Sequence, residues 1–547
     1  MLRCHANTDV RLTPMTRVTR ETRNTAAASL IENLRQARCY PHHVENIQLI
    51  ETHISWVLLT GEYVYKIKKP LDLEFLDFST LRRRHVCCED ELRLNRRLAP
   101  QIYLDVVAIT GSVTAPTIAG HGDAIEYAVK MRQFPQDALA SALLAAGKLR
   151  PQHLEALATT VSEFHRTAPA TDAGSAFGTP QAIRNAAVQN FDQLQPLLVK
   201  PDECASIAEL RAWTMREHEA QQNLMEQRRV AGAVRECHGD LHLGNIALLD
   251  DRLVAFDCLE FNPQLRWNDV LSEVAFLVMD LHDRGSPHLA WLFLNEYLGI
   301  SGDYAGIPLL PFYLVYRAMV RAKVHALRAN QPGLDQSRRD ALLHATSTYL
   351  ALAQKFAQHR RPALIITHGF SASGKSRVAG ALMQQHGAIR LRSDVERKRL
   401  QGRAPLERGA DGIAEGLYND EATRSLYTHL ADLAAKVVKT GFNVIVDAAF
   451  LKHWQRELLR NVAREAGIPF LIVSITAPAS VLRARIIRRQ AANDDPSDAS
   501  TTVLEHQLQT SDTLTATECD VAVEVSSDDQ DSGSHYQKVM EAILKIQ

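Results

Sequence analysis

The sequence predicts two domains of different fold class: an α+β domain with a small β-rich lobe and a larger helical lobe, then an α/β domain with a parallel sheet. At 547 residues the chain is too long for one hydrophobic core. In its first part, short β-rich runs precede long helical stretches. In its last part, buried-strand runs alternate with helical segments, which is typical of a parallel sheet covered on both faces.

The charge balance and the lengths of the apolar runs argue against nucleic acid and membrane as partners of this chain. Lys and Arg total 62 against 63 for Asp and Glu, a net charge of −1, whereas a protein that coats nucleic acid by electrostatics alone is far more basic. No run approaches the roughly 18 apolar residues that a membrane span needs. The eight cysteines form no C-x-x-C pair, so we expect reduced thiols and a cytoplasmic protein. Nucleic acid and membrane are therefore disfavoured as partners, and the oligomeric state stays open.

The chain divides where its composition changes. Residues 1–27 are rich in Arg and Thr and lack an apolar core, so we expect a disordered tail rather than a secretory signal. The stretch HRRP is charged and ends in proline, which is typical of an inter-domain joint. We therefore expect a first domain over 28–355, with a small lobe at about 28–134 and a large lobe at about 135–355, and a second domain over 356–547.

The small lobe is expected to be a β-sheet with one inserted helix. The runs NIQLIETHI, SWVLLT and YVYKIKK are rich in β-branched and aromatic residues, and the last two flank a turn at Gly61-Glu62 that is typical of a hairpin. Residues 79–98 open with a Ser cap and repeat apolar residues at helical intervals. Two further strands, IYLDVVAIT and EYAVKMRQF, complete the lobe.

The large lobe is expected to be helical from Asp137 to about Val230 and again through Ala353. Between these stretches lies the loop ECHGDLHLGNI, followed by two short apolar runs, IALLD and RLVAFD. In the second domain, the expected strands are ALIITHG, AIRLRS, FNVIVDA and FLIVSIT. The polar residues 524–536 are expected to form a loop.

The loop ECHGDLHLGNI has the spacing of a phosphoryl-transfer site. Such transfer needs a carboxylate to orient or deprotonate the acceptor, Mg²⁺ to bridge the phosphates, and a cation to hold them. Asp240 and Asn245 stand five positions apart, and Asp257 ends the apolar run VAF, where a second metal-binding carboxylate is expected. An isolated Asp/Asn pair is usually a capped turn. The order His-Gly-Asp, Asn and Asp after a β-rich lobe favours catalysis instead.

The strand YVYKIKK supplies the cation. Lys66 and Lys68 point to the same face of this strand, so facing alone does not separate them, and Lys66 is preferred because it follows an apolar pair inside the strand. Glu91, on the helix that follows, is placed to hold the lysine by an ion pair. It also belongs to the acidic stretch EDE, which is an ordinary helix surface, and both interpretations stay open.

The segment HGDLHLGN, followed by AFDCLEF, resembles the aminoglycoside phosphotransferase branch of the protein-kinase-like fold. The resemblance implies a bilobal kinase domain in which Asp240 is the catalytic base. It implies Asn245 and Asp257 as Mg²⁺ ligands and Lys66 on the α- and β-phosphates of ATP. The chain departs from the kinase pattern in lacking a G-x-G-x-x-G loop; the nearest turn is Thr52 to Ser55, where only backbone N–H groups could cradle phosphate.

A second phosphate-binding motif, GFSASGKS, satisfies the pattern G-x-x-x-x-G-K-[ST] between an expected strand and an expected helix. Backbone N–H groups and a helix N-terminus bind phosphate oxygens in such a loop. Lys375 is expected to reach the β- and γ-phosphates, and Ser376 to ligate Mg²⁺. The nucleotide-binding residues are Gly369, Phe370, Ser371, Ala372, Ser373, Gly374, Lys375 and Ser376.

Acidic and basic residues follow the later strands of this domain. Asp394 stands at a strand's carboxyl end, where open α/β sheets bind ligands, and can orient an acceptor hydroxyl. Asp447 ends the next strand, although it could also be a strand-end cap. The helical stretch VLRARIIRRQ carries Arg485 and Arg489 on one face, either as part of a lid over the phosphates or as a solvated surface.

This half resembles the P-loop kinases that include phage polynucleotide kinase, zeta toxin, gluconate kinase and adenylylsulfate kinase. The resemblance implies Asp394 as the base, Asp447 near Mg²⁺ or substrate, and one lid arginine, Arg485 or Arg489, on the phosphates. Over residues 28–545 the chain resembles bifunctional aminoglycoside phosphotransferase/ATP-binding proteins.

Together these features predict an ATP- and Mg²⁺-dependent phosphotransferase with two nucleotide sites, each acting on a hydroxyl of a small molecule. Two alternatives stay open: a regulatory ATP-binding protein with one inactive kinase-like domain, and a P-loop domain that phosphorylates nucleic-acid ends. Five acids follow Asp257, and we expect them to be mainly helix surface rather than an acceptor pocket. They are Glu260, Asp269, Glu273, Asp280 and Asp283.

Overall fold

The computed structural model forms two compact units. The first comprises residues 1–148 and 238–267, and the second comprises residues 149–237 and 268–547. The predicted domain boundaries near residues 27 and 355 stay predictions. The described residues are 26–73, 76–172, 174–331, 333–358, 361–403, 420–492, 500–526, 539 and 541–542, without the side chains of 489–492.

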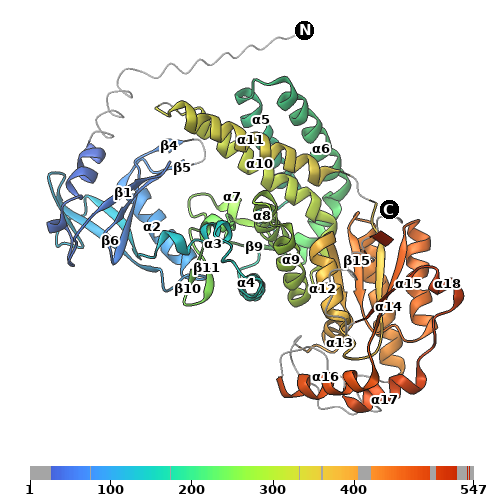
Figure 1. Cartoon of the computed structure of the whole chain (residues 1–547). Helices are drawn as coiled ribbons and strands as arrows, with labels where there is room; N and C mark the ends of the chain where they lie inside the picture. The colour runs from blue at the N-terminus through green and yellow to red at the C-terminus, as the bar shows by residue number, and fades with distance from the viewer. Residues whose placement is uncertain are drawn as a thin grey trace, which may run out of the picture. The chain divides into compact units, whose positions relative to one another are not determined.

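A six-stranded antiparallel sheet dominates the first unit (Figure 1). Its strand order is β1-β2-β3-β8-β6-β7, and the predicted hairpin is confirmed because β2 pairs antiparallel with β3, with Val57 opposite Lys66. Helix α2 packs on β6 and β8. The bounds are β1 Gln48–Glu51, β2 Ser55–Leu59, β3 Tyr63–Lys68, α2 Leu81–Asn95, β6 Tyr103–Ser112, β7 Ala115–Ile118 and β8 Glu126–Arg132.

From His238 onward the loop ECHGDLHLGNI belongs to the first unit, and it leads into a short antiparallel hairpin, β10-β11. The two strands are the expected apolar runs, and Ile246 pairs with Ala255. The hairpin therefore brings Asn245, at its start, close to Asp257, just beyond its end. The remaining bounds in this unit are η1 Ala37–Cys39, β4 Asp72–Leu73, β5 Leu76–Asp77, η2 Gln136–Ala138, α3 Ala140–Ala145, η4 Leu243–Asn245, β10 Ile246–Leu249, β11 Arg252–Ala255 and α7 Pro263–Arg266.

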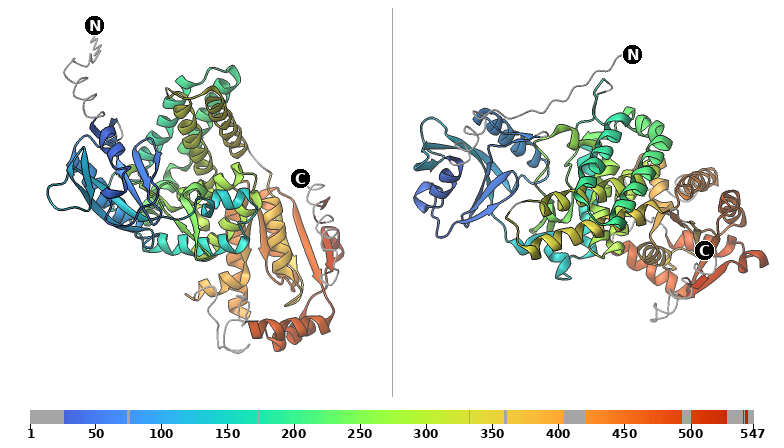
Figure 2. Two further views of the ribbon diagram at one scale, coloured as in Figure 1. Left: turned by 60° about the vertical axis from the view of Figure 1, so that its left-hand side comes forward. Right: turned by 90° about the horizontal axis from the view of Figure 1, so that it is seen from above.

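The second unit begins with the helices that the sequence predicts for the large lobe. Helices α10 and α11 lie side by side (Figure 2). Helix α4 packs on α9, and α8 contacts both α9 and α10. The bounds are α4 Pro151–Thr167, α5 Pro180–Leu194, η3 Gln195–Leu197, α6 Pro201–Val230, β9 Val234–Glu236, β12 Trp267–Asp269, α8 Val270–Asp283, α9 Pro287–Ser301, η5 Tyr304–Leu309, α10 Leu310–Ala329 and α11 Gln336–Ala357.

Helix α8 corrects one expectation. Four of the five acids predicted to be helix surface are buried, and Asp283 is half-buried. For Asp269, Glu273 and Asp280 the cause is that α8 is enclosed by other helices along most of its length, so these acids need partners inside the protein. Glu260 precedes α8 and pairs with Lys68. Asp269 pairs with Arg228 at 2.7 Å, Glu273 contacts His165 at 3.3 Å, and Asp280 pairs with Arg284 at 3.1 Å.

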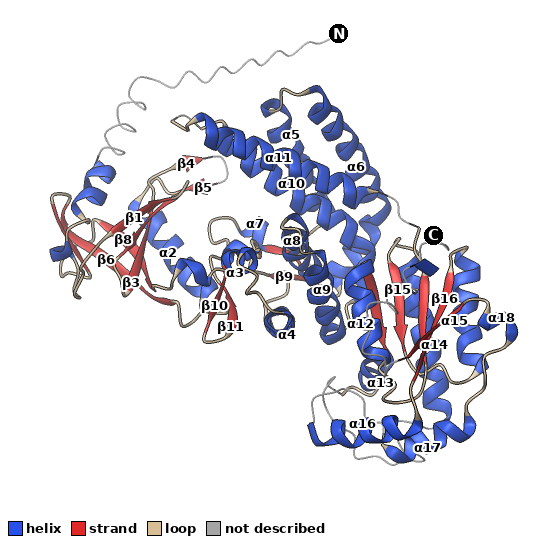
Figure 3. Ribbon diagram, viewed as in Figure 1, coloured by secondary structure: helices blue, strands red, loops and turns tan. Residues whose placement is uncertain are grey.

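The second unit also contains the predicted parallel sheet, which confirms the α/β class. The five strands run parallel in the order β14-β15-β13-β16-β17, with helices packed around them (Figure 3). Right-handed crossovers put α12 on one face and α14 and α15 on the other.

The bounds are β13 Leu364–His368, α12 Lys375–His386, β14 Ala388–Arg392, α13 Ser393–Leu400, α14 Asp420–Val438, β15 Asn443–Asp447, α15 His453–Ala466, β16 Phe470–Thr476, α16 Ala479–Ala492, α17 Thr501–Thr510, α18 Ala516–Cys519 and β17 Ala522–Ser526. The last strand corrects part of the loop expected at 524–536, because residues 524–526 pair with β16. Residues 527–536 lie outside the described residues.

Helix α9 binds the edge strand β14 through one side chain. The Asn295 amide nitrogen donates to the Ala388 carbonyl at 2.9 Å, and its amide oxygen accepts from the Arg390 N–H at 2.6 Å. Trp291, one turn earlier, packs edge-on against Phe442 with ring centroids 5.8 Å apart. A buried asparagine therefore satisfies two backbone groups that an edge strand would otherwise leave unpaired.

Candidate functional site

The loop ECHGDLHLGNI folds around a buried histidine. His238 is fully buried, and its Nε2 lies 2.9 Å from the Phe256 carbonyl oxygen, while its Nδ1 accepts from the Asp240 N–H at 3.3 Å. Gly239 has φ +88°, and a Cβ there would lie 3.1 Å from the Leu259 side chain. The His-Gly pair thus fixes the turn that presents Asp240.

Asp240 and Asn245 are brought together as the spacing predicts. The Asn245 Nδ2 donates to the Asp240 Oδ2 at 2.9 Å and to the Asp240 carbonyl at 3.1 Å. His242 shapes the turn between them, because its Nδ1 accepts from the Gly244 N–H at 3.0 Å. With its nitrogen bound to Asp240, Asn245 offers its amide oxygen as a ligand atom.

Lys66 lies between two carboxylates. Its Nζ is 2.8 Å from the Glu91 Oε1 and 2.5 Å from the Asp257 Oδ1. Burial by itself lowers the pKa of Lys66, but the charges of Asp257 and Glu91 outweigh it and raise that pKa well above its usual value. The Glu91 ion pair is therefore present in the structure, whereas an exposed helix face at Glu91 is wrong, because its side chain is fully buried.

Glu91 also binds the second lysine of β3. The Lys68 Nζ lies 2.5 Å from the Glu91 Oε2 and also pairs with Glu260. Burial raises the pKa of Glu91, but Lys66 and Lys68 together lower it to about 2. Lys68 is fully buried, whereas Lys66 reaches the partly exposed Asp257 carboxylate. The two lysines thus differ in what they contact, a distinction that strand periodicity could not supply.

The segment after Asp257 is held by residues that the sequence analysis missed. Asp257 has φ +64°, and its N–H donates to the Tyr103 hydroxyl at 3.1 Å. The Asn95 Oδ1 accepts from the Cys258 N–H at 2.9 Å. No local sequence pattern marks Tyr103 or Asn95, because each reaches this segment only through the tertiary fold.

The oxygen atoms assembled here fit Mg²⁺. The Asp257 side chain is 42% exposed, and the Asn245 amide oxygen stands at the start of the adjacent hairpin. Carboxylate and amide oxygens are the hard ligands that Mg²⁺ prefers, with water and phosphate completing its octahedron. In the β1–β2 turn, the N–H groups of Thr52 and Ser55 bond within the turn, so they are not available to phosphate.

The P-loop motif has the backbone of a phosphate cradle. Gly369 has φ +146°, and a Cβ there would overlap the Ile475 carbonyl oxygen, so only glycine fits. Gly374 has φ +98° and immediately precedes the first residue of α12, so the helix N-terminus opens at the loop. The Lys375 Nζ donates to the Phe370 carbonyl at 2.6 Å, across the loop. Ser376 is exposed on the first turn of α12.

Asp394 and Asp447 lie at the same carboxyl edge of the sheet as this loop, because β13, β14 and β15 are parallel neighbours. Asp394 is half-buried in the first turn of α13. Asp447 is buried, and its Oδ2 accepts from Arg390 Nη2 at 2.5 Å. Burial raises the pKa of Asp447, but Arg390 and Arg392 lower it below the usual range. Arg390, like Tyr103 and Asn95, is a residue that the sequence analysis missed.

The arginine-rich stretch forms α16, as predicted. Arg485 approaches the P-loop, with its Nη1 3.4 Å from the Ala372 carbonyl oxygen. The side chain of Arg489 lies outside the described residues. Gln507 on α17 also reaches the loop, because its Oε1 accepts from the Ser371 N–H at 2.9 Å.

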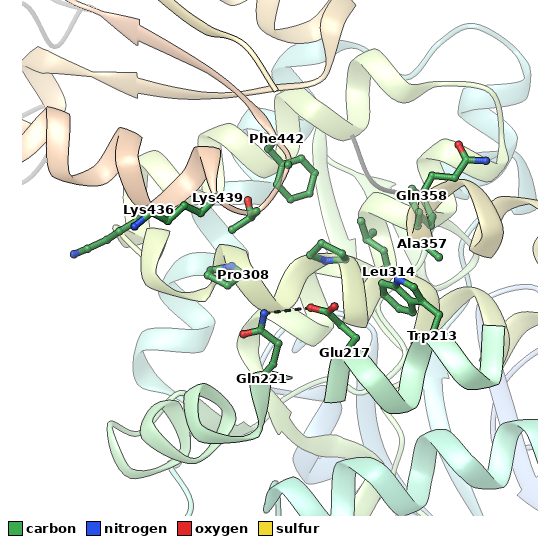
Figure 4. A pocket seen from close by; sticks show the side chains of 14 residues that line it. Trp213, Glu217, Gln221, Pro308, Leu314, Ala357, Gln358, Lys436, Lys439 and Phe442 are labelled. Atoms are coloured by element: carbon green, nitrogen blue, oxygen red, sulfur yellow. Dashed lines mark hydrogen bonds between the residues drawn. The ribbon is translucent and has the colours of Figure 1, made fainter. Parts of the chain in front are cut away.

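A cavity of about 520 Å³ opens elsewhere in the second unit (Figure 4). Trp213 and Glu217 of α6 line it together with Leu314 of α10 and Lys436 of α14, and the Glu217 carboxylate accepts from Gln221 at 3.2 Å. Among the described residues that line this cavity, none belongs to the predicted sites.

Two family models match separate parts of the chain. Residues 56–310 match the model of the phosphotransferase enzyme family, and residues 364–514 match that of an AAA domain. Uncharacterized proteins of Mycobacterium tuberculosis and Mycobacterium bovis are each 29% identical over 84% of this chain and 90% of their own length.

Solved structures with similarity to parts of the chain include two kinases. An amicoumacin kinase, in complex with AMP-PNP, Ca²⁺ and Ami, is 14% identical over 61% of this chain and 96% of its own, with a TM-score of 0.38. The APS kinase of Mycobacterium tuberculosis, in complex with AMPPNP and APS, is 19% identical over 34% of this chain and 99% of its own, with a TM-score of 0.26. The chain thus joins a region that matches the phosphotransferase enzyme family to a P-loop region that matches an AAA domain.

Proposed function

We propose that the chain is an ATP- and Mg²⁺-dependent phosphotransferase with two nucleotide sites, each transferring a phosphoryl group to a hydroxyl of a small molecule. One observation carries the proposal: Lys66 contacts both Glu91 and Asp257. Asp257 in turn follows the hairpin that starts at Asn245, the partner of Asp240. A cation, two metal-ligand candidates and a base are thus gathered within one unit.

In the first site, Asp240 accepts the proton of the acceptor hydroxyl as the acceptor oxygen bonds to the γ-phosphorus. The bond between that phosphorus and the β,γ-bridging oxygen breaks, and ADP leaves. Lys66 holds the α- and β-phosphates, and Glu91 fixes its position. Asn245 and Asp257 would hold Mg²⁺, which neutralises charge that develops on the phosphates.

In the second site, the amides of the P-loop and Lys375 hold the phosphates of ATP, and Ser376 would hold Mg²⁺. Asp394 accepts the proton of the acceptor, because it stands at the sheet edge where substrates of open α/β sheets bind. Asp447, kept ionised by Arg390 and Arg392, would assist in holding the metal. Arg485 or Arg489 stabilises the transferring group, and the 3.4 Å approach to Ala372 favours Arg485.

We also propose a cytoplasmic location, which is consistent with the free thiols of the seven cysteines in the described residues. Within that same portion of the chain, no helix is long and apolar enough to cross a membrane.

The test uses the full chain with γ-labelled ATP and Mg²⁺ against sugars, aminoglycosides, nucleosides and small alcohols. Asp240→Asn should abolish transfer to one set of acceptors and Lys375→Ala transfer to another. The controls Asp105→Asn and Lys355→Ala remove matched charges from exposed positions. Full transfer by both site variants would refute the residue assignment. Label on nucleic-acid 5′ ends alone would point to an end kinase, and loss of one set only would leave one active site.

A further inference from the structure

The metal-binding segment, residues 257–260, begins at the proposed metal ligand Asp257 with an unusual backbone conformation. Asp257 has φ +64°, in the left-handed region that residues with a side chain rarely adopt. Such a conformation persists only where surrounding contacts enforce it, and it sets the direction in which the carboxylate points. The contacts that enforce it therefore bear on how Asp257 meets a metal ion.

The first contact comes from β6. The Tyr103 hydroxyl accepts from the Asp257 N–H at 3.1 Å, and Tyr103 is only 1% exposed. Its ring is fixed in a core cluster with Leu92, Ile102 and Val129. The hydroxyl therefore sits on a rigid support and satisfies the backbone N–H of the left-handed residue itself.

The second contact comes from α2. The Asn95 Oδ1 accepts from the Cys258 N–H at 2.9 Å, and its Nδ2 donates to the Glu91 carbonyl at 2.9 Å. Asn95 is fully buried, one helical turn beyond Glu91. The same turn of α2 thus holds Lys66 through Glu91 and the metal-binding segment through Asn95. A third contact is the ion pair between Lys68 and Glu260, which holds the segment three residues after Asp257.

We propose that Tyr103 and Asn95 are positioning residues that act through Asp257 and set the affinity of the first site for Mg²⁺. The proposal rests on the function proposed above, in which Asp257 is a metal ligand. Neither side chain touches the reacting atoms: Tyr103 bonds the Asp257 backbone, and Asn95 bonds the backbones of Cys258 and Glu91. Residues that orient a metal ligand typically change metal affinity or activity 10–100-fold when replaced.

The variant Tyr103→Phe removes one hydroxyl and keeps the packed ring. Its matched control is Tyr40→Phe, in the same unit, which removes a buried hydroxyl that donates to the Leu34 carbonyl at 2.8 Å. Asn95→Ala tests the second contact separately. All variants are made in the full chain that also carries Lys375→Ala, so that the P-loop site does not contribute.

The first measurement is amide hydrogen exchange without metal or nucleotide. Tyr103→Phe should accelerate exchange in the peptide that contains Asp257 and Cys258 by about 3–10-fold, the effect of losing one hydrogen bond, and Tyr40→Phe should leave it unchanged. The second measurement is the Mg²⁺ dependence of phosphotransfer. The Mg²⁺ concentration for half-maximal rate should rise roughly 10–100-fold in Tyr103→Phe and Asn95→Ala, with metal-free ATP binding unaltered.

Exchange and Mg²⁺ dependence equal to those of Tyr40→Phe would overturn the positioning role. Asp257→Asn separates this failure from that of the proposed function. If Asp257→Asn loses transfer while Tyr103→Phe and Asn95→Ala do not shift the Mg²⁺ dependence, only the positioning role is wrong. If Asp257→Asn transfers phosphate with unchanged Mg²⁺ dependence, the metal assignment is wrong, and the positioning role is overturned with it.

Discussion

Replacing Glu91 with Gln should destabilise the first unit strongly, because this carboxylate binds two buried lysines. Its oxygens lie 2.8 Å from Lys66 Nζ and 2.5 Å from Lys68 Nζ. Breaking a buried ion pair from one side costs about 3–5 kcal/mol, since a charge is left without its partner. Each lysine keeps one other carboxylate, Asp257 for Lys66 and Glu260 for Lys68. We therefore expect the lower end, about 3 kcal/mol.

Hydrogen exchange of the peptides from α2 and β3 measures this change within its own cooperative unit. A loss of about 3 kcal/mol corresponds to exchange faster by roughly 100-fold. The matched control is Glu89→Gln on the same helix, where the side chain is 56% exposed and faces His85 at 3.4 Å. Surface changes of this kind stay within about 0.5 kcal/mol. If Glu91→Gln and Glu89→Gln exchange at the same rate, the two-lysine network does not stabilise the unit.

Three further predictions follow. First, Lys66 and Lys68 lower the pKa of Glu91 to about 2 from its ordinary 4.5. The stability that Glu91 contributes is therefore complete above about pH 4.5 and is lost as the pH falls through 2. Acid titration of the α2 exchange rates should show this loss in the unsubstituted chain and not in Glu91→Gln. Second, Gly369→Ala should reduce nucleotide binding at the P-loop at least 10-fold, because the new methyl overlaps the Ile475 carbonyl oxygen. Calorimetry with an ATP analogue in a chain that also carries Lys66→Ala would measure this binding, and unchanged affinity would contradict the cradle. Third, Arg390→Leu removes the ion-pair partner of the buried Asp447. Phosphotransfer at the P-loop site should fall about 10–100-fold, while phosphotransfer at the first site stays unaffected. An equal loss at both sites would indicate general unfolding.

Local pattern was enough to predict most of the architecture. The β2–β3 hairpin, the helix at α2 and the parallel order of β13 to β16 follow from periodicity, turn residues and the alternation of strands with helices. Asp240, Asn245 and Asp257 were predicted because catalytic loops keep fixed spacings along the chain, and in the structure Asn245 bonds Asp240. The P-loop was found for the same reason.

Contacts between distant segments could not be predicted in this way. The α8 acids were expected at the surface, because their sequence does not show that neighbouring helices enclose them. Tyr103 lies 154 positions from Asp257, and Arg390 lies 57 positions from Asp447. Lys66 and Lys68 share a strand face, and only the three-dimensional positions of Asp257 and Glu260 tell them apart.

The two hydrogen bonds between Asn295 and β14 determine where the chain can be truncated to give a soluble fragment. β14 ends one side of the parallel sheet, and Asn295 occupies its Ala388 carbonyl and Arg390 N–H. A fragment that starts after α9 would carry the whole sheet and the P-loop but lack this asparagine. Its edge strand would then offer free donors and acceptors to the same strand of another molecule, the arrangement from which β-sheet aggregation starts. If such a fragment is insoluble, the cause would therefore be that β14 has lost the asparagine that covers its edge, rather than that the P-loop is misfolded.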